Sequence, residues 1–219
     1  MTPINKKWAM QFADDPVIEN IRKALLPAQI SDGADEVKRD GQRGAAVFML
    51  LVNRPVNHAN NWQVILTQRP ETMPSHPGQI AFPGGKREAG ETIVQTALRE
   101  TREEIGIKAQ DIDILGRLPS FNTASHFRIT PFVGLASPKA AIIPDPREVD
   151  EVFEVPLEFL MNEDNHKDRI IDYTDKKFHL TDMPYTGPDG VYRNIWGMTA
   201  MMIFRLYQRS VLGVFEVDY

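Results

Sequence analysis

The sequence of 219 residues contains no cysteine. This absence excludes disulfide bonds, thiolate metal ligands and a cysteine nucleophile, and it is typical of a reducing compartment, so we expect a cytoplasmic protein. The sequence also lacks an apolar run long enough to span a bilayer and, near its start, the apolar core of a secretion signal. Its net charge of −5 disfavours non-specific binding to nucleic acid.

The composition that remains is that of a globular protein, with 42% hydrophobic and 25% charged residues. No internal repeat, low-complexity tract or long linker divides the sequence. Asp15 and Pro16, followed by apolar residues at helical spacing, predict a short amphipathic helix near the N-terminus. We therefore expect an N-terminal helical extension over residues 1–30 and a single domain over residues 31–219.

Short apolar segments predict more strands than helices, and the two kinds do not alternate regularly. The expected strands lie at 45–52, 64–67, 79–82, 112–118, 129–135 and 152–155, with a helical turn at 156–161 and a closing helix at 195–210. Residues 31–44 are expected to form a loop, and the polar residues 162–177 an exposed excursion. Pro131 predicts an edge or irregular position for its strand. This order favours an α+β fold with a mixed sheet covered by helices over a doubly wound parallel sheet.

One helix is marked at both of its ends. Thr92 and Gln95 fit a capping box at the start, and Gly106 followed by Ile107 fits a glycine stop. The residues that recur at helical spacing, and that we expect to form its buried stripe, are Val94, Leu98, Thr101 and Ile105.

Three carboxylates, Glu100, Glu103 and Glu104, lie in the last turns of this helix. At about 100° per residue they fall within roughly 100° of one another, on the face away from the expected stripe. The helix dipole disfavours anions there by roughly 0.3–1 kcal/mol each, and like charges at i,i+4 add roughly 0.2–0.5 kcal/mol. A divalent cation would reverse both penalties, and oxygen ligands favour Mg²⁺ or Mn²⁺ over Zn²⁺.

The same acids could form a solvated face that Arg99 and Arg102 balance, because charge runs on helices are common. The loop before the helix favours the metal interpretation instead. Gly84 and Gly85 let the backbone approach a phosphate or a metal closely.

The segment from Gly85 to Ile107 resembles the Nudix box, the signature of the Nudix hydrolases. The pattern is glycine, five residues, glutamate, seven residues, and then Arg-Glu-U-x-Glu-Glu-x-Gly-U, where U is a bulky aliphatic residue. The matching residues are Gly85, Glu91, Arg99, Glu100, Glu103, Glu104, Gly106 and Ile107. Thr101 departs from the pattern at a U position, where its methyl group can still pack. The resemblance implies an α/β/α sandwich with a mixed sheet and hydrolysis of a nucleoside diphosphate linked to another group.

Other segments are similar to the coenzyme A pyrophosphatase branch of this family, over a stretch from about Ala45 to Ser210. These segments are residues 65–69, 75–85, 126–134, 148–157 and 195–200. Pro70 stands where that branch has a small residue, and Pro74 where it has an arginine. The resemblance implies coenzyme A or a derivative as substrate, with 4′-phosphopantetheine and adenosine 3′,5′-bisphosphate as products.

The resemblance also implies roles for the acids of the motif. Glu100 and Glu104 are expected to hold Mg²⁺ or Mn²⁺, and Glu103 and the backbone carbonyl of Gly85 are further candidate ligands. Glu103 is the first candidate for the group that orients or deprotonates the attacking water, with Glu151 in reserve.

Two more residues of the motif are expected to support the acids. Arg99 would brace them as an ion pair, and Glu91 would support the loop or interact with the metal through its ligands. Basic residues that could hold substrate phosphates are Arg69, Lys86, Arg87 and Arg128, with a solvated surface as the competing interpretation for Lys86 and Arg87. His76 is expected to hydrogen-bond the loop. Three aromatic residues are expected in the core: Phe127, Phe132 and Trp196.

Other functions remain open at this point. Another Nudix substrate is possible, such as ADP-ribose, a dinucleotide or a nucleoside triphosphate. A non-hydrolysing ligand sensor could reuse the fold, and the acidic helix could be a protein docking face. A homodimer is a family-level expectation, while neither a nucleic acid nor a membrane is expected as a partner.

Overall fold

The computed structural model describes residues 6–29, 41–73, 77–173 and 176–215. The helices are α1 Lys7–Met10, α2 Pro16–Ala24, α3 Ile93–Ile105, α4 Leu157–Leu160 and α5 Gly197–Ser210, with 3₁₀ turns at Ala109–Asp111 and Glu163–Asn165. The strands are β1 Arg43–Asn53, β2 Trp62–Gln68, β3 Ile80–Ala81, β4 Gly84–Lys86, β5 Ile112–Arg117, β6 Phe121–Asn122, β7 Phe127–Ala136, β8 Glu151–Pro156, β9 Lys167–Tyr173, β10 Lys176–Thr186 and β11 Tyr192–Ile195.

The larger sheet is mixed, as the sequence predicted. Its strands run in the order β3-β2-β1-β7-β5, and β4, β6 and β8 pair with β1, β7 and β2. β1 and β7 are parallel from the Arg43–Phe127 pair to the Val52–Ala136 pair, whereas the other pairings in this sheet are antiparallel. The long parallel pair of β1 and β7 therefore lies inside the sheet, between β2 and β5.

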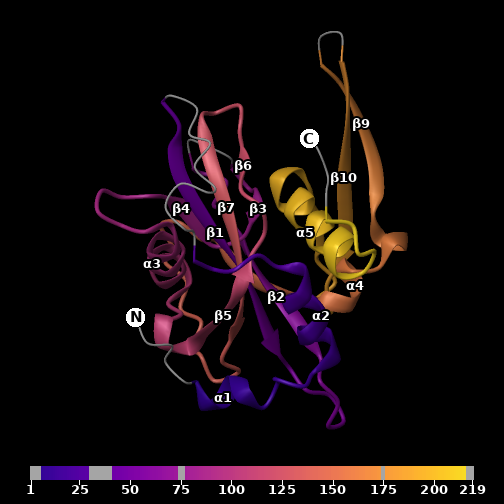
Figure 1. Ribbon diagram of the computed structural model, residues 1–219. Helices are drawn as coiled ribbons and strands as arrows, with labels where there is room; N and C mark the ends of the chain where they lie inside the picture. The colour runs from indigo at the N-terminus through magenta and orange to yellow at the C-terminus, as the bar shows by residue number, and fades with distance from the viewer. Residues whose placement is uncertain (1–5, 30–40, 74–76, 174–175, 216–219) are drawn as a thin grey trace.

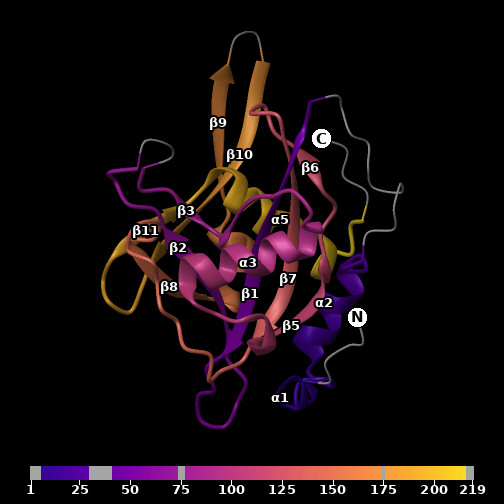
Figure 2. The ribbon, with the colours of Figure 1, turned by 90° about the vertical axis from the view of Figure 1, so that its left-hand side faces the viewer.

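Both faces of this sheet are covered, which follows from the continuous apolar sequence of β1. Successive side chains of a strand point to opposite faces, so Phe48 and Leu50 join one core cluster while Met49 and Leu51 join the other. The first cluster packs against α3, and the second against α2 and α5. Figures 1 and 2 show α3 on one side of the sheet and α2 and α5 on the other. The arrangement is the expected α/β/α sandwich.

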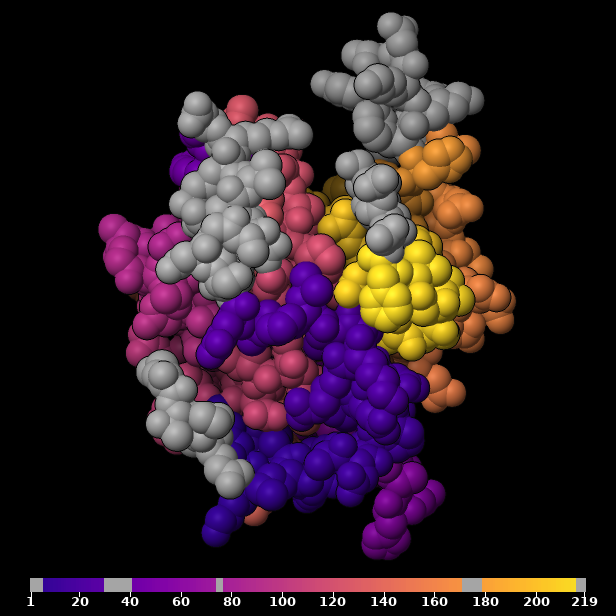
Figure 3. Space-filling model, in the orientation of Figure 1, coloured from indigo at the N-terminus to yellow at the C-terminus, as the bar shows by residue number. Residues whose placement is uncertain are grey.

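The N-terminal segment packs on the second of these faces. Asp15 caps α2 by accepting hydrogen bonds from the N–H groups of Val17 and Ile18, at 2.9 and 3.2 Å. Its other carboxylate oxygen accepts from the Asn60 amide and the Trp62 indole, at 2.6 and 3.2 Å. This confirms the predicted helix start. Figure 3 shows the indigo N-terminal segment lying against the yellow helix α5.

A second, three-stranded sheet has the order β11-β10-β9, and β9 and β10 form a hairpin that projects from the body (Figure 1). The sequence predicted an exposed excursion over 162–177 but missed that it contains β9 and the start of β10. Polar side chains on this hairpin hide the two-residue periodicity that marks a strand with one buried face. Among the described helices, none is long and apolar enough to cross a membrane.

The predicted position of Pro131 is corrected in part. Its strand, β7, is not at an edge but lies between β1 and β5. The expected irregularity is present, because β7 pairs with β6 at Arg128 and Ile129 and with β5 from Phe132 to Ala136. Proline lacks a backbone N–H, and Pro131 lies where one partner strand gives way to the other. The predicted core position of Phe132 is confirmed, but Phe127 is partly buried and Trp196 is 41% exposed.

Candidate active site

Helix α3 carries most of the predicted site, and its ends are as the sequence indicated. The Gln95 N–H donates to Thr92 Oγ1 at 3.3 Å, and the Thr92 N–H donates to Gln95 Oε1 at 2.7 Å, which completes the capping box. At the other end Gly106 has a φ of 76°, a left-handed conformation that favours glycine. These caps set the first and last residues of α3, so Glu100, Glu103 and Glu104 lie in its last two turns.

The predicted buried stripe of α3 is only partly right. Thr101 and Ile105 are buried, but Val94 and Leu98 are partly buried, and Ala97 is fully buried. Glu104 is also buried, with 4% of its surface exposed, so it does not lie on the solvent face. The glycine strand β4 lies beside α3.

Glu104 has a hydrogen-bond partner in this buried position. The Gly84 N–H donates to its Oε2 at 3.2 Å. The spacing of apolar residues could not predict that Glu104 is buried, because a buried carboxylate interrupts the apolar pattern of the stripe.

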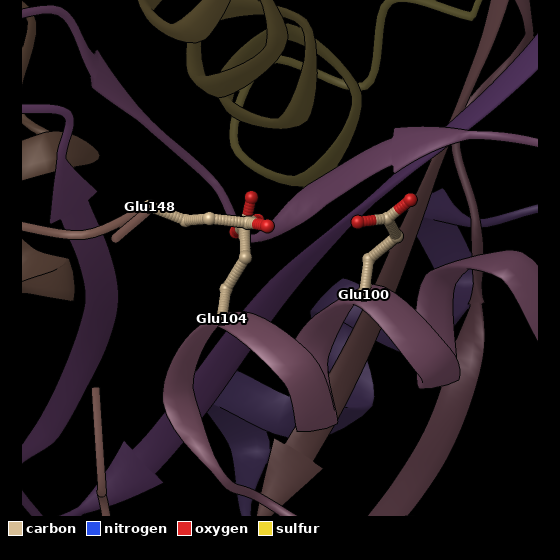
Figure 4. A group of neighbouring side chains, drawn as sticks. All are labelled: Glu100, Glu104 and Glu148. Carbon is tan, nitrogen blue, oxygen red and sulfur yellow. The ribbon is translucent and has the colours of Figure 1, made fainter. Parts of the chain in front are cut away.

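Three carboxylates meet beside this helix: Glu100, Glu104 and Glu148. Each offers an oxygen atom that lies within 4.8 Å of the others, and Figure 4 shows Glu148 reaching across to Glu104 from a separate segment. A Cβ on Gly85 would lie 2.4 Å from Glu100 Oε1, so a glycine is needed to leave the space for this carboxylate. Three acidic oxygens with no sulfur or nitrogen donor suit a hard cation such as Mg²⁺ or Mn²⁺.

The sequence did not single out Glu148 as a site residue. It lies between β7 and β8, in an acid-rich run over 145–151 that was the available signal. The Ile143 N–H donates to the Ile105 carbonyl and the Asp145 N–H to the Glu104 carbonyl, both at 2.9 Å. The backbone of this segment is therefore attached to the end of α3, which brings Glu148 to the other two acids.

Burial makes the charge of this cluster costly. Burial, together with the neighbouring carboxylates Glu100 and Glu148, raises the pKa of Glu104 to about 8, although the Gly84 N–H and the charge of Arg69 oppose the rise. Burial also raises the pKa of Glu100. A bound divalent cation would offset these penalties, so both the donor set and the electrostatics fit a metal site.

Arg99 forms ion pairs with three acids of the motif. Its Nε donates to Glu91 Oε1 at 2.6 Å, its Nη1 donates to Glu100 Oε1 at 3.0 Å and Glu103 Oε2 at 2.9 Å, and its Nη2 donates to the Lys86 carbonyl at 2.9 Å. The bond from Arg99 lowers the pKa of Glu91 to about 2. The guanidinium thus connects β4 and the segment before α3 to the acids of the helix, and these contacts are the geometry that a bracing role needs.

The two candidates for the water-activating group lie outside the three-carboxylate cluster. The side chain of Glu103 is 44% exposed and paired with Arg99. Glu151 accepts hydrogen bonds from Arg193 Nε at 3.1 Å and from Arg193 Nη2. Their chemical roles remain predictions.

The predicted phosphate-binding residues differ in their surroundings. The charge of Arg69 acts on Glu104, and the buried Nε of Arg69 has no hydrogen-bond partner in the described part of the chain. Lys86 Nζ lies 5.7 Å from the centre of the Phe127 ring, and Arg128 Nη1 donates to Asn122 at 3.4 Å. His76 and Pro74 lie outside the described residues.

Comparisons with known proteins agree with this architecture. The model of the NUDIX domain family matches residues 42–174. A protein named "Uncharacterized Nudix hydrolase NudL" from Photorhabdus laumondii is 34% identical over 178 residues, covering 78% of this chain and 86% of the relative. One of the same name from Pectobacterium atrosepticum is 32% identical over 166 residues, covering 75% and 81%. The crystal structure of a MutT/nudix family protein from Enterococcus faecalis superimposes with a TM-score of 0.51 at 20% identity, covering 80% of this chain and 64% of the other.

Proposed function

The chain belongs to the Nudix hydrolase family, and we propose that within this family it hydrolyses the pyrophosphate bond of coenzyme A or of a coenzyme A derivative. The observation that carries the hydrolysis is the cluster of Glu100, Glu104 and Glu148, whose oxygens lie within 4.8 Å of one another. The substrate is supported by the segments 65–69, 75–85, 126–134, 148–157 and 195–200, which resemble the coenzyme A branch. The products would be 4′-phosphopantetheine and adenosine 3′,5′-bisphosphate.

The three clustered glutamates would hold Mg²⁺ or Mn²⁺, and the backbone carbonyl of Gly85 is a further candidate ligand. When bound, the cation would supply positive charge against the oxygens of the diphosphate. Arg99 keeps Glu100 in place through the 3.0 Å bond from Nη1, and Gly84 keeps Glu104 in place through its N–H. Both ligands are thus oriented before a substrate arrives, which lowers the reorganisation that binding requires.

Glu103 is our candidate for the group that orients or deprotonates the attacking water. Its side chain is 44% exposed, Oε2 accepts a hydrogen bond from Arg99 Nη1 at 2.9 Å, and Oε1 accepts one from Arg102 Nη2 at 3.5 Å. A carboxylate accepts about four hydrogen bonds, so Glu103 retains the capacity to accept one from water. A Glu103→Gln variant should lose about 100-fold or more in turnover with little change in metal affinity. A loss of less than a few-fold would remove Glu103 from this role.

Arg69 is our candidate for the main phosphate contact, with Lys86 and Arg128 as additional ones. The buried Nε of Arg69 has no partner among the described residues, and a buried N–H donor without a partner costs about 1–3 kcal/mol. A substrate phosphate would satisfy it. Arg69→Ala should therefore raise the Michaelis constant more than it lowers kcat, while Arg22→Ala, on α2, serves as the control. An unchanged Michaelis constant would exclude Arg69 as a phosphate ligand.

The substrate proposal is tested with a panel of nucleotides and both metals, with the products identified by mass. Coenzyme A, acyl forms, oxidised coenzyme A, ADP-ribose, dinucleotides and nucleoside triphosphates belong in the panel. A clear preference for a compound other than a coenzyme A derivative would refute the branch assignment but leave the hydrolytic reaction standing. A rate for Glu104→Gln within a few-fold of wild type would refute the metal assignment.

A further inference from the structure

Arg193 on β11 is a buried cation with two carboxylate partners. It is 4% exposed, and its guanidinium lies 4.6 Å from the centre of the Phe153 ring. Nε donates to Glu151 Oε2 at 3.1 Å, and Nη2 donates to Glu151 Oε1 and to Asp189 Oδ2, the latter at 2.7 Å. A planar guanidinium that binds one carboxylate through two of its nitrogens has a fixed orientation. Arg193 therefore fixes both oxygens of Glu151.

Glu151 is three residues beyond Glu148 in the sequence, so the two side chains are joined by a short piece of backbone. Three residues span at most about 10 Å even when fully extended. The Asp150 N–H donates to the Gln68 carbonyl at 2.9 Å, and Glu151 then pairs with Gln68 as the first residue of β8. The link that carries Glu148 is the segment of residues 145–151. Its C-terminal end, at Asp150 and Glu151, is thus anchored to β2 through the backbone and to β11 through Arg193.

The N-terminal end of the same link, at Asp145, is anchored to α3. The Asp145 N–H donates to the carbonyl of Glu104, and the Glu148 N–H donates to the carbonyl of Asp145 at 3.0 Å. A segment that is held at both ends has few conformations left, and its position sets where the Glu148 carboxylate lies relative to Glu100 and Glu104.

We propose that Arg193 and Glu151 are positioning residues, which act together to place the Glu148 carboxylate in the metal-binding cluster. This inference rests on the proposed metal role of Glu148. It also competes with the prediction that Glu151 is the reserve base, because both of its oxygens accept hydrogen bonds from Arg193 and its charge is neutralised by this partner. Glu151 thus either positions Glu148 or activates the attacking water. The two roles predict different effects of the same Glu151 substitutions on metal binding and on turnover.

The first test measures Mn²⁺ binding to the free protein, without substrate, from the electron paramagnetic resonance signal of unbound Mn²⁺. Glu151→Ala should weaken Mn²⁺ binding by about 10- to 100-fold, as expected for residues that orient metal ligands. Glu151→Gln should weaken it less, because the amide oxygen still accepts a hydrogen bond from Arg193. Arg193→Lys should also weaken Mn²⁺ binding, because a lysine cannot hold both oxygens of Glu151.

A matched control is available on the same strand. Glu154 also lies on β8 and forms an ion pair with Arg54 at 2.7 Å, but it is not part of the carboxylate cluster. Glu154→Ala should leave Mn²⁺ binding unchanged. Thermal unfolding of each variant checks that it is folded, and Glu151→Gln keeps the test decisive if Arg193→Lys does not fold.

The second test separates the two roles of Glu151 by kinetics. If Glu151 is a brace, Glu151→Gln at saturating Mn²⁺ should keep kcat within a few-fold of wild type and keep the same dependence on pH. If it is the base, kcat should fall by about 100-fold or more at every Mn²⁺ concentration, and the acid limb of the pH profile should disappear. That result would overturn the proposal.

The outcomes also separate this proposal from the proposed function. Wild-type protein that binds Mn²⁺ as tightly as Glu151→Ala would overturn the positioning role alone. Wild-type protein that binds no Mn²⁺ would overturn both.

Discussion

Replacing Glu104 by glutamine is expected to stabilise the metal-free protein, and to do so more strongly at high pH. Glu104 is 4% exposed, and burial raises its pKa from 4.5 to about 8. Glutamine has nearly the same volume and keeps an oxygen for the Gly84 N–H, but it cannot ionise. The difference in stability between the two proteins therefore isolates the cost of one buried negative charge.

The sign of this effect follows from proton binding by Glu104 in the folded and unfolded states. Below pH 4.5 the carboxyl is protonated in both, so it carries no penalty. As the pH rises from 4.5 to about 8, the unfolded state loses the proton first, and the free energy of unfolding of the wild type falls by about 1.4 kcal/mol per pH unit relative to the variant. Above about pH 8 the full difference of about 5 kcal/mol is present.

Urea unfolding followed by far-ultraviolet circular dichroism, in buffers that contain EDTA, measures this difference at about pH 5, 7 and 9. Glu158→Gln, at an exposed position of α4, is the control and should show no such pH dependence. Added Mg²⁺ should stabilise the wild type at high pH more than the variant, because the cation offsets the buried charge. A difference between wild type and Glu104→Gln that is constant from about pH 5 to 9 would refute the reasoning.

Three further substitutions test the surroundings of the site and the N-terminal segment. Gly85→Ala should weaken Mn²⁺ binding about 10-fold or more with little loss of stability, because its Cβ would lie 2.4 Å from the movable Glu100 carboxylate; unchanged affinity in calorimetric titration would contradict this. Gly84→Ala should instead lower the free energy of unfolding by about 1–3 kcal/mol, since its Cβ would meet the backbone of β1 at 2.4 Å; a urea titration without such a loss would be evidence against the close approach. Asp15→Ala should lower the free energy of unfolding by about 1–3 kcal/mol, because it removes the cap of α2 and the acceptor for the Trp62 indole. Hydrogen exchange of the α2 amides that stays as slow as in the wild type would argue against the cap.

The elements that the sequence predicted well are those whose causes are local. A capping box, a left-handed glycine and an aspartate before a proline each act within about one helical turn, so Thr92, Gly106 and Asp15 could be assigned from their neighbours in the chain. The long apolar run of β1 was equally clear, because burial on both faces of a sheet requires apolar side chains at every position.

The parts that the sequence missed depend on contacts between distant segments. Glu148 is 44 residues from Glu104 and reaches it only because the backbone of residues 143–145 binds the end of α3. Arg193 is farther still, and neither its burial nor its two carboxylate partners can be inferred from spacing. Trp196 was expected in the core, but it is the residue directly before α5, and 41% of its surface is exposed.

The acids at the end of α3 violate the preference of a helix terminus for positive charge, and the fold does not remove the conflict. Arg99 neutralises part of the charge, and Gly84 supplies one N–H, yet burial still raises the pKa of both Glu100 and Glu104. A structural role would be served better by apolar side chains, because a buried carboxylate without a full complement of partners destabilises the folded state. The loop that adds Glu148 increases the negative charge instead of relieving it. An arrangement that lowers the stability of the metal-free protein while bringing a third carboxylate into place is expected where a cation completes the site.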